Sequence, residues 1–141
     1  MTTFESSLKT VSVPRKPVFG FLSDIKNFES LVPEGIVKNF VAVKNNCRFD
    51  VDGLGEVGVR LAATNPDHTI IYESEGSRPF RFDLIIDLNE QDDQSTLMKL
   101  TFRAELNMMM KMMVQKPLED GLEVIASELV DHLNGRQWIT E

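Results

Sequence analysis

Cysteine and histidine are nearly absent from this chain, which has one cysteine and two histidines in 141 residues. Cys47 has no partner for an intramolecular disulfide, and His68 and His132 are too far apart in sequence to form a metal-ligand motif. We therefore expect no metal ion and no cofactor. No Ser/His/Asp arrangement or phosphate-binding glycine loop stands out, so no residue is predicted to be catalytic.

Long apolar runs are also missing. No stretch approaches the roughly 18 residues that a membrane span needs. Residues 1–5 have neither the basic nor the apolar region of a secretory signal. These features predict a cytoplasmic protein without stable membrane insertion.

Positive charge is scarce, because 15 Lys and Arg residues oppose 22 Asp and Glu residues, which gives a net charge of −7. Nucleic-acid binding needs a basic face for the phosphates, so we expect no nucleic-acid partner. The same acidity argues against simple electrostatic attachment to an anionic membrane.

What is present is an ordinary globular composition, with 42% hydrophobic and 26% charged residues. A chain of this length buries roughly two-thirds of the surface that its unfolded form exposes. We therefore expect one domain over residues 1–141.

Residues 36–106 have the two-residue period of β-strands, interrupted by turn signals at short intervals that favour antiparallel hairpins. The predicted strands are 37–44, 46–52, 55–63, 68–76, 79–89 and 95–106. An earlier strand over residues 2–13 has a mixed pattern, which a bulge or a change of buried face near residues 9–10 would explain. Two short helices are predicted after it, one opening at Pro17 and one over residues 25–31.

The last segment, from about Met108 to Leu133, has apolar residues at steps of three or four, which is typical of an amphipathic helix. Its apolar side is predicted to consist of Val114, Leu118, Leu122, Ile125, Leu129 and Leu133. Pro117 lies inside this pattern and predicts either a helix start or a kink.

Three groups of short motifs occur in a fixed order along the chain. They are Val11-Ser-Val13-Pro14 followed by Val18-Phe19-Gly-Phe21-Leu22-Ser23-Asp24, then Ile25-Lys-Asn27-Phe28 with Leu31-Val-Pro33, and finally Leu118-Glu-Asp-Gly121-Leu122 with Leu129. In this order and spacing the chain resembles the START-like, or Bet v 1-like, helix-grip superfamily, which includes polyketide cyclase-like proteins.

The resemblance implies an α+β helix-grip fold, in which a curved antiparallel sheet of about seven strands wraps around the long C-terminal helix. It also implies a cavity between the sheet and the helix. In that superfamily the cavity holds lipids, sterols, aromatic polyketides, hormones or nothing identified, and the fold does not select among these. The superfamily has no shared catalytic signature that would transfer to this chain.

Five of the seven methionines fall within six residues, where the last strand leads into the helix: Met108, Met109, Met110, Met112 and Met113. Methionine adapts to irregular apolar shapes and also fills irregular cores, so Met108, Met109, Met112 and Met113 are predicted either to fill core space where the strand leads into the helix or to form the adjustable lip of a pocket. If they form a lip, at least two of the five should border the space between helix and sheet. Methionine commonly fills cores, which favours core filling, whereas Lys111 indicates that part of the run faces water and favours the pocket lip.

The remaining predicted ligand contacts come from the strands and the helix: Tyr72, Ser74, Phe80, Phe82, Met98, Phe102, Leu118 and Gly121. The aromatic side chains would stack on a flat ligand, or would simply be ordinary core. Tyr72 and Ser74 share one parity and would offer hydroxyls to a polar end of the ligand. Gly121 costs about 1 kcal/mol in a helix relative to alanine, so it either leaves space for a ligand or a close strand, or marks a bend.

The charged strand residues lie mostly on the wet face by parity, which predicts cross-strand ion pairs and not acid–base chemistry. Cys47 shares parity with apolar neighbours and is predicted to be an inert buried thiol.

Three functions remain open at this point. The first is binding or carriage of a small apolar molecule, lipid-like or aromatic, in the cavity. The second is a cyclase- or aromatase-like enzyme, for which Tyr72 or Ser74 should be paired with an inward carboxylate or histidine. The third is a protein-interaction module that uses exposed methionines and Trp138. The sequence allows an oligomer but does not predict one.

Overall fold

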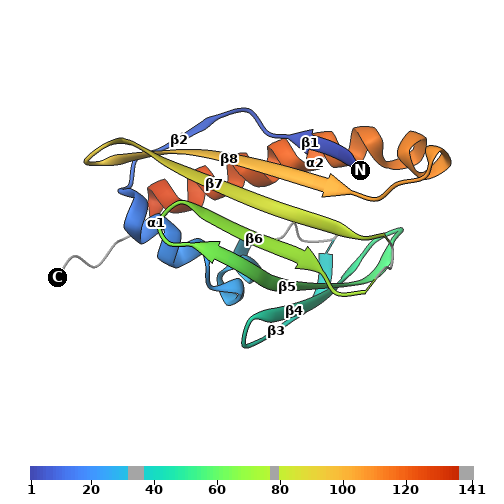
Figure 1. Ribbon diagram of the computed structural model, residues 1–141. Coiled ribbons are helices and arrows are strands. Elements are labelled where there is room, and N and C mark those ends of the chain that lie inside the picture. Colours follow the sequence, from blue (N-terminus) through green and yellow to red (C-terminus); the bar gives the residue numbers. More distant parts are fainter. Residues whose placement is uncertain (32–36, 77–79, 137–141) are drawn as a thin grey trace.

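The computed structural model describes residues 1–31, 37–76 and 80–136. Within them an antiparallel sheet of eight strands carries two short helices and a long C-terminal helix (Figure 1). The strands are β1 (Thr2–Glu5), β2 (Lys9–Val11), β3 (Val37–Val43), β4 (Asn46–Val51), β5 (Gly55–Asn65), β6 (Thr69–Ser74), β7 (Phe82–Asp92) and β8 (Ser95–Ala104). The helices are α1 (Arg15–Leu22), the 3-10 helix η1 (Ile25–Leu31) and α2 (Met108–Gly135).

The six strands predicted between residues 36 and 106 are confirmed, with each end within three residues of its expected position. The strand order is β1-β8-β7-β6-β5-β4-β3, so each strand from β3 to β8 pairs with its sequence neighbour. This is the hairpin topology that the short turns favoured.

The prediction of one strand over residues 2–13 is wrong, because the chain forms two short strands that both pair with β8. Buried Ser6 lies in the break between them. Its backbone N–H donates to the carbonyl of Leu100 at 2.9 Å, and its hydroxyl oxygen accepts the Leu100 N–H at 2.9 Å. The side chain therefore replaces a backbone acceptor where the strand is interrupted.

Helix α1 begins at Arg15, two residues before the predicted start, and Pro17 occupies its first turn, where a missing N–H is tolerated. Its buried residues are Val18, Phe21 and Leu22. The predicted end of η1 at Pro33–Gly35 lies outside the described residues, as does Trp138.

Helix α2 starts at Met108, where the side chain of Asn107 accepts the Met110 N–H at 2.8 Å. Pro117 lies inside the helix and does not begin it. The buried residues are Leu122, Ala126, Leu129 and Leu133, all in the second half. Ile125, which was predicted on the apolar side, is 36% exposed, because the buried stripe passes through Ala126 instead.

The core lies between α2 and the sheet face that carries Ile70, Tyr72, Ile86, Met98 and Leu100. Helix α1 closes one end of it. No helix in the described part of the chain is long and apolar enough to cross a membrane.

Candidate functional site

An apolar row crosses the sheet on the face that packs toward α2. The strand register aligns Leu61, Tyr72, Leu84, Phe102 and Phe4 across β5, β6, β7, β8 and β1. Tyr72 and Phe4 are buried, whereas Leu61, Leu84 and Phe102 are only half-buried. Part of the helix-facing surface is therefore apolar but incompletely covered.

The first half of α2 leaves this surface open. None of its residues from 108 to 121 is buried, in contrast to the four buried residues further along. Leu106, just before the helix, and Leu118 are half-buried and pack against the core. We call the half-buried group on the two sides of this opening the open apolar face: Phe82, Leu84, Phe102, Leu106 and Leu118.

The predicted aromatic residues do come together. The rings of Phe82 and Phe102 stack with centroids 5.0 Å apart and an interplanar angle of 22°. Phe80 meets Phe82 edge-on at 6.1 Å and is itself buried. Met98 is fully buried in the core. Whether any of them touches a ligand stays a prediction.

A second stacked aromatic pair was not predicted from the sequence. Phe40 and Phe49 lie on paired strands β3 and β4, with ring centroids 6.0 Å apart and an angle of 11°. A register shift between Lys38 and Val41, and the positive φ of 58° at Asn39, break the alternation of β3. Because of that irregularity, the two-residue alternation does not predict which face of the sheet Phe40 lies on, whereas it does so for Phe49.

Tyr72 and Ser74 use their hydroxyls within the chain. The Tyr72 hydroxyl donates to the Leu22 carbonyl at 2.5 Å, and Phe28 packs edge-on against the ring at 5.3 Å. The Ser74 hydroxyl oxygen accepts the Phe82 N–H at 3.0 Å, and the hydroxyl donates to the Gly76 carbonyl at 3.4 Å. Both have backbone partners here, and their contact with a ligand stays a prediction.

Two groups in this region have altered acidity. Burial raises the pKa of Tyr72 well above its usual value, and the charges of Asp24 and Cys47 act in the same direction. Burial, with a smaller contribution from Glu75, raises the pKa of the Cys47 thiol to about 11. Cys47 is 4% exposed, so the prediction of a buried thiol is confirmed.

The methionine run is exposed. The exposed fractions are 82% for Met108, 73% for Met109, 81% for Met112 and 71% for Met113. Core filling is therefore wrong for these four side chains. Met110 is half-buried and lies one turn from half-buried Val114. A ligand contact of Met109, Met112 or Met113 stays a prediction.

Gly121 is half-buried within α2, and a Cβ placed on it would have no atom within 4 Å other than the adjoining backbone of its own helix. A closely approaching strand is therefore not the reason for this glycine. The space beside it is open.

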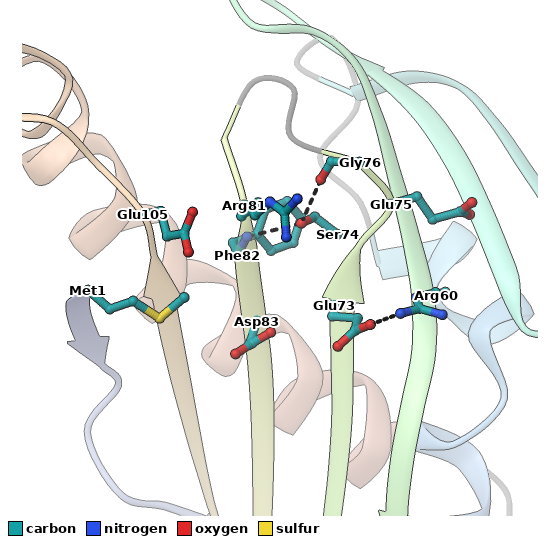
Figure 2. A pocket seen from close by; sticks show the side chains of 10 residues that line it. All are labelled: Met1, Arg60, Glu73, Ser74, Glu75, Gly76, Arg81, Phe82, Asp83 and Glu105. Atoms are coloured by element: carbon teal, nitrogen blue, oxygen red, sulfur yellow. Dashed lines mark hydrogen bonds and ion pairs between the residues drawn. The ribbon is translucent and has the colours of Figure 1, made fainter.

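A polar pocket of about 430 Å³ lies at one end of the sheet, where β6 ends and β7 begins (Figure 2). Strand alternation places Glu73 and Asp83 on the face opposite to that of Tyr72, which is the face away from α2. The charged lining residues are Arg60, Glu73, Glu75, Arg81, Asp83 and Glu105. This lining does not suit an apolar ligand, and the pocket was not predicted from the sequence.

Cross-strand ion pairs were expected on this outer face and are confirmed. Arg60 pairs with Glu73, and Arg103 pairs with Asp83 at 2.8 Å. Lys99 pairs with Glu5 at 3.2 Å. Among the residues that the structure describes, no three His, Cys, Asp or Glu side chains are grouped as metal ligands would be.

No family model matches the chain, and no curated protein matches it in sequence. Solved structures do resemble it. A START superfamily protein from Mycobacterium smegmatis is 15% identical with a TM-score of 0.74, over 93% of this chain and 96% of that one. Norcoclaurine synthase from Thalictrum flavum is 10% identical with a TM-score of 0.76, over 96% and 87% of the two chains.

The di-domain ARO/CYC BexL from the BE-7585A biosynthetic pathway is 12% identical with a TM-score of 0.74, over 94% of this chain and 46% of that one. Sequence identities this low show only that the folds are similar. Together with the curved antiparallel sheet and long C-terminal helix, they show that the chain has the START/Bet v 1-like helix-grip fold.

Proposed function

We propose that this protein binds a small apolar ligand, lipid-like or aromatic, on the open apolar face beside the first half of α2. The observation that carries the proposal is the half-buried state of Leu84 and Phe102 on the sheet face toward α2 and of Leu118 on the helix itself. Covering such surface contributes roughly 25 cal/mol per Å² removed from water. The stacked rings of Phe82 and Phe102 favour a ligand with a flat apolar part.

The names of two structural neighbours are in keeping with a ligand site in this fold. One is a synthase, and the other is an ARO/CYC protein of a biosynthetic pathway. The enzyme alternative has less support in this chain. It needs Tyr72 or Ser74 paired with a carboxylate or histidine, whereas both hydroxyls bond to backbone groups in the described structure.

The first test is mass spectrometry of small molecules extracted from the purified protein, followed by titration with anilinonaphthalene sulfonate. We expect a co-purified apolar molecule, or saturable fluorescence enhancement by the probe. Leu118→Trp puts a larger side chain at the open apolar face and should weaken probe binding several-fold. Gln115→Trp is the matched control, because Gln115 is an exposed residue of the same helix and its variant should bind as the wild type does.

Thermal unfolding of both variants establishes that they are folded. The proposal is wrong if the wild type carries no apolar molecule and binds no probe. It is equally wrong if folded Leu118→Trp and Gln115→Trp bind the probe alike.

A further inference from the structure

The exposed methionines and two lysines form one segment at the start of α2. We call this segment, residues 108–118, the methionine tip. Its four exposed methionines are each more than 70% exposed. Met108 and Met112 are one turn apart, as are Met109 and Met113, so the four share one broad side of the helix. Met110, Val114 and Leu118, also at steps of four, are the half-buried residues of the segment.

The beginning of the tip lies beyond the sheet, whereas Leu118 at its other end packs against the core. Figure 1 shows the first turns of α2 extending beyond the end of β8. The buried residues of the helix begin only at Leu122. A contiguous apolar surface that a folded protein leaves in water marks an interaction site more often than an accident of sequence.

The charge of the tip differs from that of the rest of the chain. It contains Lys111 and Lys116 and no acidic residue, in a chain of net charge −7. The remainder of the chain therefore carries −9. Lys116 lies 3.4 Å from Asp120, but both side chains are highly exposed, so solvent screens this pair. An anionic surface would attract this segment and repel the remainder.

We propose that the methionine tip docks on the surface of an anionic lipid bilayer. The methionines would enter the boundary between headgroups and acyl chains, and the lysines would extend toward the headgroups. A second copy of the chain fits the tip less well, because tip-to-tip packing brings lysines of like charge together. Docking is peripheral and oriented, since the acidity of the whole chain opposes attachment by charge alone. It does not depend on the ligand proposed above.

The test is co-sedimentation of the intact protein with vesicles of phosphatidylcholine alone or of phosphatidylcholine with phosphatidylglycerol. We expect binding to the anionic vesicles at low salt, and loss of binding as salt is added. The variant M108Q/M109Q/M112Q/M113Q should lower binding about tenfold. The variant K111Q/K116Q should remove the preference for anionic vesicles while leaving weak binding to both.

Two matched controls test whether vesicle binding depends on the methionine tip or on exposed apolar and basic side chains anywhere in the chain. V41T/V43T removes other exposed apolar side chains, and K16Q/K38Q removes two exposed lysines elsewhere. Both should bind vesicles as the wild type does. The proposal is overturned if the wild type does not bind anionic vesicles at low salt. It is also overturned if the control variants bind as weakly as the tip variants. It is also overturned if the tip methionines instead hold a dimer that the quadruple variant converts to monomer.

Discussion

Tyr72 is the residue whose chemistry the fold changes most. It is the only tyrosine, it is 2% exposed, and its hydroxyl donates to the Leu22 carbonyl. The partner lies 50 residues away in sequence, so the parity of the strand predicted an inward hydroxyl but not where its hydrogen bond goes. In the core of the folded protein the neutral phenol is strongly preferred over the phenolate.

The first prediction concerns the titration of this group. Because the pKa of Tyr72 is raised on folding, its contribution to stability is complete below the unfolded pKa of about 10 and is lost as pH rises through the folded pKa. Absorbance spectroscopy at about pH 11 should show almost no phenolate in the native protein and predominantly phenolate after unfolding. A native titration midpoint near pH 10 would contradict it, and Tyr72→Phe provides the baseline.

Gly121 gives the second prediction. A Cβ at this position meets no atom within 4 Å other than the adjoining backbone of its own helix, so Gly121→Ala should raise the free energy of unfolding by about 1 kcal/mol through better helix propensity alone. Gly58→Ala is the contrasting variant, because its Cβ would lie 3.1 Å from the Cβ of Glu75, the residue that follows the neighbouring strand β6. It should give no gain. Chemical denaturation of both variants measures the difference, and a Gly121→Ala variant less stable than the wild type would contradict the prediction.

At the scale of elements, one side chain joins α2 to the N-terminal strands. The Glu123 carboxylate accepts the backbone N–H of Ser7 and, at 3.2 Å, its hydroxyl. It also lies 3.0 Å from the Lys9 ammonium. Ser7 belongs to the break between β1 and β2, so this contact holds the interrupted edge of the sheet on the helix.

The third prediction tests this contact with Glu123→Gln. The Ser7 N–H, followed by Lys9, lowers the pKa of Glu123. Its contribution to stability is therefore present above the ordinary carboxyl pKa and is lost as pH falls through the folded value. Glu123→Gln should unfold at lower denaturant than the wild type at neutral pH, and the gap should shrink on acidification. Glu128→Gln, an exposed carboxylate variant in the same helix, should show neither effect, and a gap that does not change with pH would contradict the prediction.

The elements differ in how far local sequence determines them. Strands β3 to β8 were predictable because alternation and turn residues act over a few positions. The break between β1 and β2 was not, because it depends on Ser6 reaching Leu100, 94 residues away. The exposure of the methionine side chains could not be predicted from the sequence either, because it depends on where the sheet ends beneath α2. Phe82 and Phe102 were predicted together because their parity and strand order place them on adjacent strands.

At the scale of the whole molecule, α2 has two unequal halves. The second half packs Leu122, Ala126, Leu129 and Leu133 into the same core as the central strands. The first half has no buried residue. Helices draw most of their stability from packing of an apolar face, so the two halves should not have the same local stability.

This difference gives the last prediction, which hydrogen exchange read by mass spectrometry can check. Amides of α2 between residues 110 and 118 should exchange faster than those between 122 and 133, which should match the slow exchange of β7 and β8. A ligand on the open apolar face should protect the first half of the helix together with β7, whereas docking of the methionine tip on vesicles should protect the helix alone. Uniform protection along α2 in the free protein would mean that the first half is as firmly held as the second, contrary to its burial.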